Sequence, residues 1–484
     1  MRGVRLLLWL PLFLTLTACP PAGKDSDDTG SEADADTDVD SDTDTDTDTD
    51  TDDPCQRLIP DPDPAVNSAQ IEACLLNGSA RLLEGLFHVS NMLEIPQGAV
   101  LGGAGKDLTI IRLTAEAETL LKIGGDTHVH DLALDLAGLV QAGCCASALQ
   151  IQGSNNLVER TWLGSTIPSL EAHDIGVYWL SETGSDNVVR ESEISGTFYG
   201  AIFRSGMLVE AGNRLENSEI HDTRCDGVTF VGYGEAVDNE IFHVGWDCEN
   251  GPIPGAAVYS LNNGDGALLS GNEIYDTCGH GVDLDGGDNF IIDGNTVYNP
   301  GYTWNGLYGW CGGAQAALAL IDVSNSSITG NSFLNEGRPA NSIIGDSNHV
   351  FSSASGSLAS DLPAASSTVI AAWLTQRPSS LGEAVSNVFE DNVMRASCSP
   401  PCLGVGYFTS RGTGMDAGGG WSASTTNYFR GNNPIGSNHG SKRCGGNWYA
   451  GDSDCPQNST DSECNFDDYQ HDFDSLRNDN CRNY

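Results

Sequence analysis

Acidic and basic side chains that could do chemistry gather in two short stretches near the middle of the chain. The stretch DTCGHGVDLDGGDN carries His280, Asp283, Asp285 and Asp288, and the upstream stretch HDTRCDGVTF carries Arg224. On a strand, Asp283 and Asp285 would point to one side, roughly 7 Å apart. Carboxyls at that spacing suit acid–base cleavage of a glycosidic bond or Ca²⁺ binding. We therefore treat Arg224, His280, Asp283 and Asp285 as candidate catalytic residues, and Asp283, Asp285 and Asp288 as candidate calcium ligands.

The same residues also admit a purely structural interpretation. Asp and Asn fill turns because they tolerate left-handed backbone and hydrogen-bond to their own main chain. A Gly-His-Gly turn that precedes an apolar strand needs no catalytic role. The catalytic, cation-binding and structural interpretations therefore all stay open at this point.

Aromatic residues form a second group of candidates. Trp246 lies between the two acidic stretches, and the segment GYTWNGLYGW adds Tyr302, Trp304, Tyr308 and Trp310. Flat aromatic faces can stack on sugar rings, and exposed clusters often mark binding surfaces. The alternative is that these side chains cover the apolar outside of a strand layer.

The elements that must position these residues repeat along the chain. Each unit has a polar residue shortly before an apolar anchor, then a polar turn and a Gly-led apolar strand such as DGVTFVG or HGVDLDG. A period of 20–50 residues with this turn chemistry indicates a solenoid, and a propeller blade of 40–45 residues would be longer. The anchors are spaced 21–36 residues apart and are Leu134, Trp162, Ile194, Ile220, Ile241, Ile274, Val297 and Phe333.

The start of this region adds a recognisable order of elements. Residues 68–76 have helical apolar spacing, and short strands cut by Gly and Pro follow. Together with Asn before the anchors, as in GNEI and GNTV, this order resembles the right-handed parallel β-helix of the pectin-lyase-like superfamily. The resemblance implies an all-β solenoid over residues 55–440, a short N-terminal capping helix, and a Cys-rich C-terminal cap over 441–484. Residues 337–386 carry no clear anchor and are expected to form a long loop or an irregular coil.

The resemblance also sets expectations for function. Enzymes of this superfamily act on the outer face of one strand layer, and its lyases use an Arg or Lys beside a carboxylate that a cation neutralises. The likeness to polygalacturonases is limited to Gly279-His280-Gly281, and their Asn-Thr-Asp and paired-Asp elements do not occur upstream. We expect a protein that binds, and could process, carbohydrate. A polysaccharide hydrolase or lyase and a non-catalytic surface rod are the alternatives.

The N-terminus has the features of a lipoprotein export signal. Arg2 and Arg5 precede an apolar run that is too short to span a membrane. The run ends in Leu-Thr-Ala-Cys19, which resembles the lipobox of bacterial lipoproteins. We expect a signal peptide at 1–18 and a lipidated Cys19 that anchors the chain at the outer membrane or cell surface. Residues 19–54, rich in Asp and Thr, would form a disordered linker.

The cysteine count agrees with export. Setting Cys19 aside leaves 14 of the 15 cysteines, an even number that favours disulfides. The cysteine and histidine spacings do not match a zinc site. Sequence-neighbour pairing leaves the adjacent Cys144 and Cys145 and predicts the bridges Cys55–Cys74, Cys225–Cys248, Cys278–Cys311, Cys398–Cys402, Cys444–Cys455 and Cys464–Cys481.

Net charge excludes some partners. The chain carries −45 at pH 7, and residues 54–484 alone carry −33. Such a surface repels nucleic acid, and it disfavours acidic polysaccharides unless cations mediate. We expect a monomer that contacts the membrane only through its lipid, binds no nucleic acid, and has a polysaccharide or surface glycan as its partner. No cofactor is expected with certainty, and Ca²⁺ is the one candidate.

Overall fold

The structure is a computed structural model, and part of the chain can be described from it. The predicted signal peptide, Cys19 and the linker up to residue 52 lie outside the described residues, as do Tyr302, Trp304, Tyr308 and Trp310. Beyond residue 335 mainly separate strands are described. The continuous described ranges are 53–115, 117–137, 144–167, 173–181, 184–205, 212–246, 255–261, 265–298 and 316–335.

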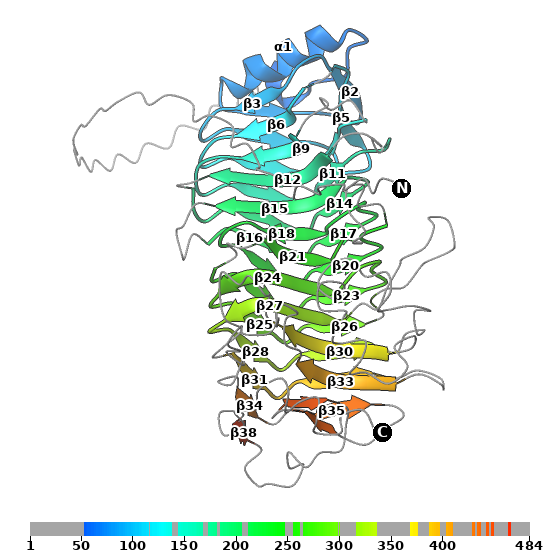
Figure 1. Cartoon of the computed structure of the whole chain (residues 1–484). Coiled ribbons are helices and arrows are strands. Elements are labelled where there is room, and N and C mark those ends of the chain that lie inside the picture. The colour runs from blue at the N-terminus through cyan, green and yellow to red at the C-terminus, as the bar shows by residue number, and fades with distance from the viewer. Residues whose placement is uncertain are drawn as a thin grey trace, which may run out of the picture. The chain divides into compact units, whose positions relative to one another are not determined.

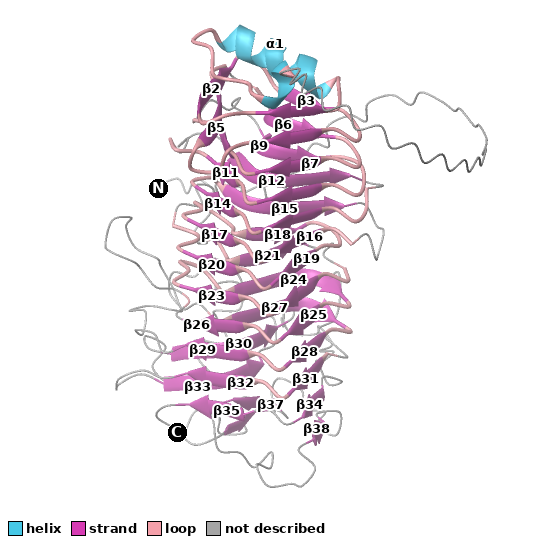
Figure 2. Ribbon diagram, turned by 180° about the vertical axis from the view of Figure 1, so that it is seen from behind, coloured by secondary structure: helices cyan, strands magenta, loops and turns pink. Residues whose placement is uncertain are grey.

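Three parallel sheets run along the described domain, and each successive turn of chain adds one strand to each sheet (Figures 1 and 2). We name each sheet after its first strand. The β1 sheet contains β1 (Ser79–Arg81), β4 (Val100–Gly102), β7 (His128–His130), β10 (Leu157–Glu159), β13 (Val188–Arg190), β16 (Arg214–Glu216), β19 (Glu235–Val237), β22 (Leu268–Ser270), β25 (Ile291–Asp293), β28 (Ser327–Thr329), β31 (Val388–Glu390), β34 (Tyr428–Arg430) and β38 (Glu463–Asn465).

The other two sheets follow the same rule. The β2 sheet contains β2 (Gly85–Val89), β5 (Thr109–Leu113), β8 (Ala133–Asp135), β11 (Trp162–Gly164), β14 (Glu193–Ser195), β17 (Glu219–His221), β20 (Glu240–Phe242), β23 (Glu273–Tyr275), β26 (Thr296–Tyr298), β29 (Ser332–Asn335), β32 (Val393–Ala396) and β35 (Asn433–Gly436). The β3 sheet contains β3 (Leu93–Ile95), β6 (Thr119–Ile123), β9 (Cys144–Ile151), β12 (His173–Ser181), β15 (Tyr199–Ser205), β18 (Val228–Phe230), β21 (Val258–Leu261), β24 (Val282–Asp288), β27 (Leu318–Ser324), β30 (Thr368–Thr375) and β33 (Leu403–Thr409).

This arrangement confirms the predicted β-helix solenoid. Alternate residues of each strand point inward, and their apolar side chains form one continuous core. One predicted anchor was wrong by one residue. Leu163, fully buried, takes the core position in register with Leu134 and Ile194, and Trp162 points outward with its indole N–H donating to Ser195 Oγ at 2.9 Å. The strand β30 also shows that residues 337–386 are not wholly a loop.

Buried asparagines join the coils at the turn between the β1 and β2 sheets. The Asn239 side-chain amide donates to Asn272 Oδ1 at 3.0 Å, and Asn272 donates to Asn295 at 2.8 Å. Asn331 and Asn392 continue the row. The residue before each of these asparagines has positive φ, so Asp or Gly fills it without severe strain. The ladder satisfies amides that would otherwise be buried without partners, as the GNEI and GNTV patterns predicted.

A helix covers the N-terminal end of the stack. Helix α1 (Pro64–Leu75) contacts β1, β2 and β3 (Figure 1). It begins four residues earlier than the apolar spacing indicated, because Asp63 caps it by accepting from the Ala65 N–H and proline occupies its first position. The predicted Cys55–Cys74 disulfide is confirmed and ties the short helix η1 (Pro54–Gln56) to α1. The capping helix is therefore confirmed.

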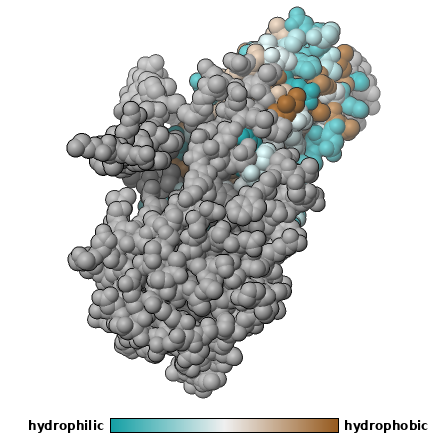
Figure 3. All heavy atoms as spheres, turned by 45° about the vertical axis from the view of Figure 1, so that its right-hand side comes forward, coloured by the Kyte–Doolittle hydropathy of each residue, from teal (hydrophilic) through white to brown (hydrophobic). Residues whose placement is uncertain are grey.

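At the other end, only isolated strands can be described. β38 pairs antiparallel with β34, and β36 (Lys442–Cys444) pairs antiparallel with β37 (Asn447–Tyr449). The rest of the predicted Cys-rich cap lies outside the described residues. The described surface seen in Figure 3 mixes hydrophilic residues with scattered hydrophobic ones. No helix within the described residues has the length and apolar character needed to span a membrane.

Candidate functional site

The two central acidic candidates lie on β24. Asp283 and Asp285 alternate there with Val282 and Leu284, which belong to the core. Their carboxyls therefore leave the outer side of the β3 sheet, as the strand pattern predicted. Both side chains are nevertheless buried, at 4% and 1% exposure. The expectation that these two residues lie on an accessible outer face is therefore wrong. Strand alternation predicts the side of the sheet that a residue occupies, but not what packs against that side.

Arg224 lies in the loop between β17 and β18 and is fully buried. Its backbone N–H donates to Thr197 O at 2.9 Å, which holds the loop against the preceding coil. Its guanidinium carbon stands 5.1 Å from the Phe198 ring centre and 6.0 Å from that of Trp246. This contact with two aromatic rings stabilises the cation in place. An outward basic side chain was expected, and the observed one is enclosed.

Asp174 provides a buried negative charge near this cation. It is 1% exposed, and its Oδ1 accepts from the Phe198 N–H at 2.8 Å. Burial raises the pKa of Asp174 to about 6, against the lowering effects of that hydrogen bond and of the Arg224 charge. No motif near Asp174 indicates this role, because its strand lies two coils upstream of the Arg224 loop and their proximity arises only from the stacking of coils.

Asp226 is a second buried carboxyl with a raised pKa. It is 6% exposed, its Oδ1 accepts from the Ala256 N–H at 3.0 Å, and its Oδ2 accepts from Thr229 Oγ1 at 3.4 Å. Burial, with a smaller contribution from the negative charge of Asp283, raises the pKa of Asp226 to about 7. Asp226 and Asp283 therefore interact although two coils separate their strands.

His280 stands at the position equivalent to Asp226, two coils further along. Each comes two residues before a valine, Val228 or Val282, and both valines are in register with Val258 on the strand between them. His280 is 8% exposed, and its Nδ1 accepts from the Ala316 N–H at 2.8 Å. Burial lowers the pKa of His280 to about 4. The ring is therefore neutral at pH 7 with its proton on Nε2, so it can donate a hydrogen bond from that atom.

Asp288 does not join the other two candidate calcium ligands. It lies three residues beyond Asp285, roughly 10 Å along the strand, and its backbone N–H donates to Asp265 Oδ1 at 2.9 Å. Burial raises the pKa of Asp288, and the charge of Asp265 adds to this. Within the described residues, a different group has converging metal-binding atoms, namely Glu193, Glu219 and His221 on the β2 sheet. The proposed calcium set of Asp283, Asp285 and Asp288 is thus not brought together.

The remaining candidates divide between described and undescribed parts of the chain. Trp246 is half-buried beside Arg224. Cys225 and Cys278 are both disulfide-bonded, and their predicted partners Cys248 and Cys311 lie outside the described residues. Nothing described tests the other predicted pairs, which are Cys398–Cys402, Cys444–Cys455 and Cys464–Cys481.

Comparison with known proteins identifies the architecture. Residues 147–348 match the family described as a right handed beta helix region. No curated protein matches the sequence. Solved structures with a similar fold include the Dettilon tailspike protein, at 14% identity and a TM-score of 0.42, where the match covers 69% of this chain and 66% of that chain.

Two further solved structures are enzymes of bacteria. The A-module of a mannuronan C-5 epimerase of Azotobacter vinelandii matches at 13% identity and a TM-score of 0.38, over 71% of this chain and 95% of that chain. The DFA-IIIase of Arthrobacter chlorophenolicus matches at 11% identity and a TM-score of 0.45, over 77% and 91%. At these identities the chemistry of this chain must be derived from its own side chains.

Proposed function

We propose that the outer side of the β3 sheet around β18 and β24 binds a polysaccharide and hydrolyses it. The observation that carries this proposal is the Asp226–Asp283 pair, in which one carboxyl keeps its proton near pH 7 beside an interacting second carboxyl. Glycoside hydrolysis needs such a pair, with one carboxylic acid to protonate the leaving oxygen and one carboxylate to attack the sugar or activate water. Asp226 takes the first role and Asp283 the second.

Hydrolysis fits the site better than elimination does. A lyase needs a basic side chain that can reach the proton beside the substrate's carboxylate. Arg224 is held beside Phe198 and Trp246, and it cannot take up that proton because arginine stays protonated in proteins. We therefore assign Arg224 a positioning and electrostatic role. His280, neutral with Nε2–H, supplies a hydrogen-bond donor, and Asp285 adds a second carboxyl two residues along the strand from Asp283.

The charge of the chain points to a neutral glycan. Residues 54–484 carry −33, which opposes the approach of polyanions such as pectate. The cellular setting we propose is that of an exported monomer, lipidated at Cys19 and held away from the outer membrane by the linker of residues 19–54. This setting rests on the sequence features alone.

Release of reducing ends from a panel of neutral polysaccharides tests the hydrolase. Asp226→Asn and Asp283→Asn each remove one carboxyl with little change of shape, and loss of the general acid should lower the rate by about 100-fold or more. Asp238→Asn is the matched control, since Asp238 is an exposed turn residue with φ of 54° and asparagine tolerates that conformation. Equal rates for the three variants and the unmodified chain would refute the assignment.

Glycan binding without turnover is the second candidate. The observation that favours it over hydrolysis is the enclosure of Arg224, His280, Asp283 and Asp285, each at most 8% exposed, which hinders a bound sugar from reaching the carboxyls. A glycan array that reports binding, while the same glycans stay uncleaved, would support this candidate over hydrolysis. If the chain neither binds nor cleaves any of these glycans, the non-catalytic structural rod is the remaining interpretation.

A further inference from the structure

The outer side of the β2 sheet carries a column of glutamates on four consecutive strands. They stand in register, one above the next, on β14, β17, β20 and β23. Neighbouring parallel strands are about 4.8 Å apart, so like charges in such a column repel each other. Each carboxylate is therefore stabilised by a neighbour that donates a hydrogen bond to it or offsets its charge. The four residues are Glu193, Glu219, Glu240 and Glu273.

Three of the four glutamates have such a neighbour. Glu193 Oε2 accepts from Lys106 Nζ at 2.7 Å. Glu240 and Glu273 accept from the phenol groups of Tyr275 and Tyr298, respectively. The exception is Glu219, whose side chain makes no hydrogen bond or ion pair within the described part of the chain. Among the described residues, Glu219 is thus the one carboxylate of the column without a hydrogen-bond donor of its own.

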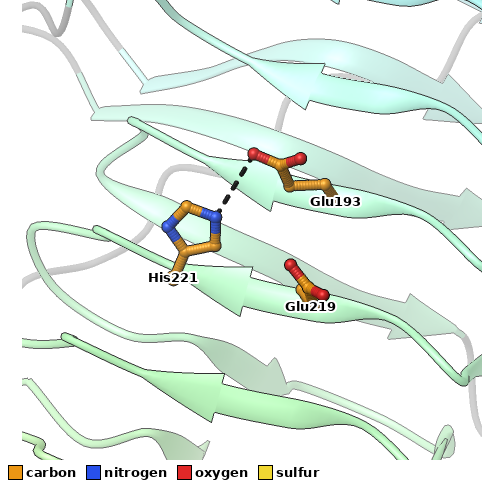
Figure 4. A group of neighbouring side chains, drawn as sticks. All are labelled: Glu193, Glu219 and His221. Carbon is orange, nitrogen blue, oxygen red and sulfur yellow. Dashed lines mark hydrogen bonds and ion pairs between the residues drawn. The ribbon is translucent and has the colours of Figure 1, made fainter. Parts of the chain in front are cut away.

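A histidine stands beside that position. His221 follows two residues after Glu219 on β17, so both side chains leave the same side of the sheet. Its Nε2 lies 3.3 Å from Glu193 Oε1, and the ligand atoms of Glu193, Glu219 and His221 all lie within 4.8 Å of one another (Figure 4). The opposite ring nitrogen, Nδ1, lies 2.8 Å from Asp222 Oδ2.

We propose that Glu193, Glu219 and His221 bind one divalent ion of the zinc class, with Asp222 orienting the imidazole from behind. One imidazole nitrogen and two carboxylate oxygens leave a fourth position open in a tetrahedral site. Ligand atoms about 2.1 Å from a shared zinc would lie roughly 3.4 Å apart. A small rotation of the exposed Glu219 side chain closes the remaining distance. The nitrogen ligand disfavours Ca²⁺, which takes oxygen ligands.

The β-helix holds these ligands in place before any ion arrives. Glu193 pairs with Glu219 and Ser195 pairs with His221 in the parallel register of β14 and β17, so backbone hydrogen bonds fix their spacing. The imidazole also stacks on Phe242, with ring centres 4.9 Å apart and planes 10° apart. Lys106 occupies only Oε2 of Glu193 and leaves Oε1 directed at the site. A histidine fixed through its second nitrogen by a carboxylate is a common arrangement at zinc sites.

Calorimetric titration of the purified, metal-stripped full chain with Zn²⁺ tests the proposal. The Asp-rich residues 36–53 can bind cations loosely, so the readout is the difference between variants. Glu219→Gln and Glu273→Gln remove the same charge from the same column, but only the first removes a proposed ligand. We expect the unmodified chain and Glu273→Gln to bind one more tight equivalent of Zn²⁺ than Glu219→Gln. Asp222→Asn should weaken that equivalent by about 10- to 100-fold.

Co²⁺ gives a second readout, because its visible absorption reports nitrogen ligation and tetrahedral geometry. These bands should be present in the unmodified chain and absent in His221→Gln. The same Zn²⁺ isotherm for Glu219→Gln and Glu273→Gln, or Co²⁺ bands that persist in His221→Gln, would overturn the proposal. If His221→Gln fails to fold by circular dichroism, Glu219→Gln decides alone, since Glu219 is exposed and makes no described contact that folding needs. The site lies on a different sheet from Asp226, so its outcome is independent of the proposed hydrolase.

Discussion

The outer sides of the β3 and β2 sheets are built on the same stacked coils, but their charged side chains are arranged differently. On the β2 sheet like residues stack, so that His221, Phe242, Tyr275 and Tyr298 form a row of nearly parallel rings about 5 Å apart. Their glutamate neighbours stay partly exposed. On the β3 sheet unlike residues meet, and Arg224, Asp226, Asp283 and Asp285 are enclosed. On the β2 sheet, hydrogen bonds from neighbouring side chains satisfy Glu193, Glu240 and Glu273 locally. In the enclosed cluster, burial instead raises the pKa of Asp174 and Asp226, as is common at functional sites.

Stacking also bears on carbohydrate binding. Rings that cover each other's faces at about 5 Å offer only their edges to a ligand, so the row on the β2 sheet is a poor platform for sugar rings. The aromatic residues beside Arg224, Phe198 and Trp246, lie instead in segments that connect the β2 and β3 sheets. The stacked row therefore adds no sugar-binding platform to the β2 sheet, and the proposed hydrolysis stays with the β3 sheet.

The largest expected effect comes from removing an enclosed cation. Arg224→Leu would leave the buried carboxylate of Asp174 without its nearby positive charge and should lower the free energy of unfolding by about 3–5 kcal/mol. Arg214→Leu is the matched control, since Arg214 is 42% exposed on its side chain and pairs with Glu216 and Glu235. Its cost should be about 1 kcal/mol or less. Urea unfolding measures both, and equal losses would contradict the contrast between enclosed and exposed charges.

The contributions of the two surfaces to the free energy of unfolding should change with pH in opposite directions. The pKa of Asp226 is raised to about 7 by burial and by Asp283, so its ionisation destabilises the fold as pH rises from about 4 to 7. Asp226→Asn should therefore be neutral at pH 4 and stabilising at pH 8, by up to about 4 kcal/mol. Unfolding free energies at the two pH values measure this. A variant that is destabilised at pH 8 would show that the carboxylate is well accommodated.

Glu193 gives the converse case. The hydrogen bond from His221 and, beyond it, Lys106 hold the pKa of Glu193 at about 2 despite partial burial. The ionised Glu193 therefore contributes to the free energy of unfolding above its unfolded pKa near 4.5, and this contribution is lost as the pH falls toward 2. Glu193→Gln should cost about 1 kcal/mol at pH 7 and little at pH 2. Thermal melts of metal-free protein at both pH values check this, and a cost that persists at pH 2 would contradict it.

The smallest expected effect concerns the stacked row. Tyr275→Phe keeps the ring between Phe242 and Tyr298 and removes only the phenol that donates to Glu240. The loss of one partly exposed hydrogen bond should cost about 1 kcal/mol. Tyr298→Phe, which removes the equivalent bond to Glu273, is the matched comparison. Unfolding midpoints for the pair should agree, and a much larger loss for one would mean that the row is not uniform.

The sequence predicted the repeat, the capping helix and the side of the sheet that Asp283 and Asp285 occupy, because these follow from local periodicity. It misplaced one anchor at Trp162, where two adjacent apolar residues made the register ambiguous. It did not predict the enclosure of Arg224 or Asp283, since burial depends on contacts between distant segments. It also missed the Glu193, Glu219 and His221 group. Aligning RESEIS with ENSEIH on their isoleucines would have placed these residues on neighbouring strands.

Direct titration of the Asp226 carboxyl tests the central claim most closely. Difference infrared spectra between the unmodified chain and Asp226→Asn isolate this one group across pH 3 to 9. We expect a protonated carboxyl band that disappears with a midpoint near the raised pKa of about 7, and a lower midpoint when Asp283→Asn removes the neighbouring charge. A midpoint near 4 that does not respond to Asp283→Asn would contradict the assignment of Asp226 as the acid of the pair.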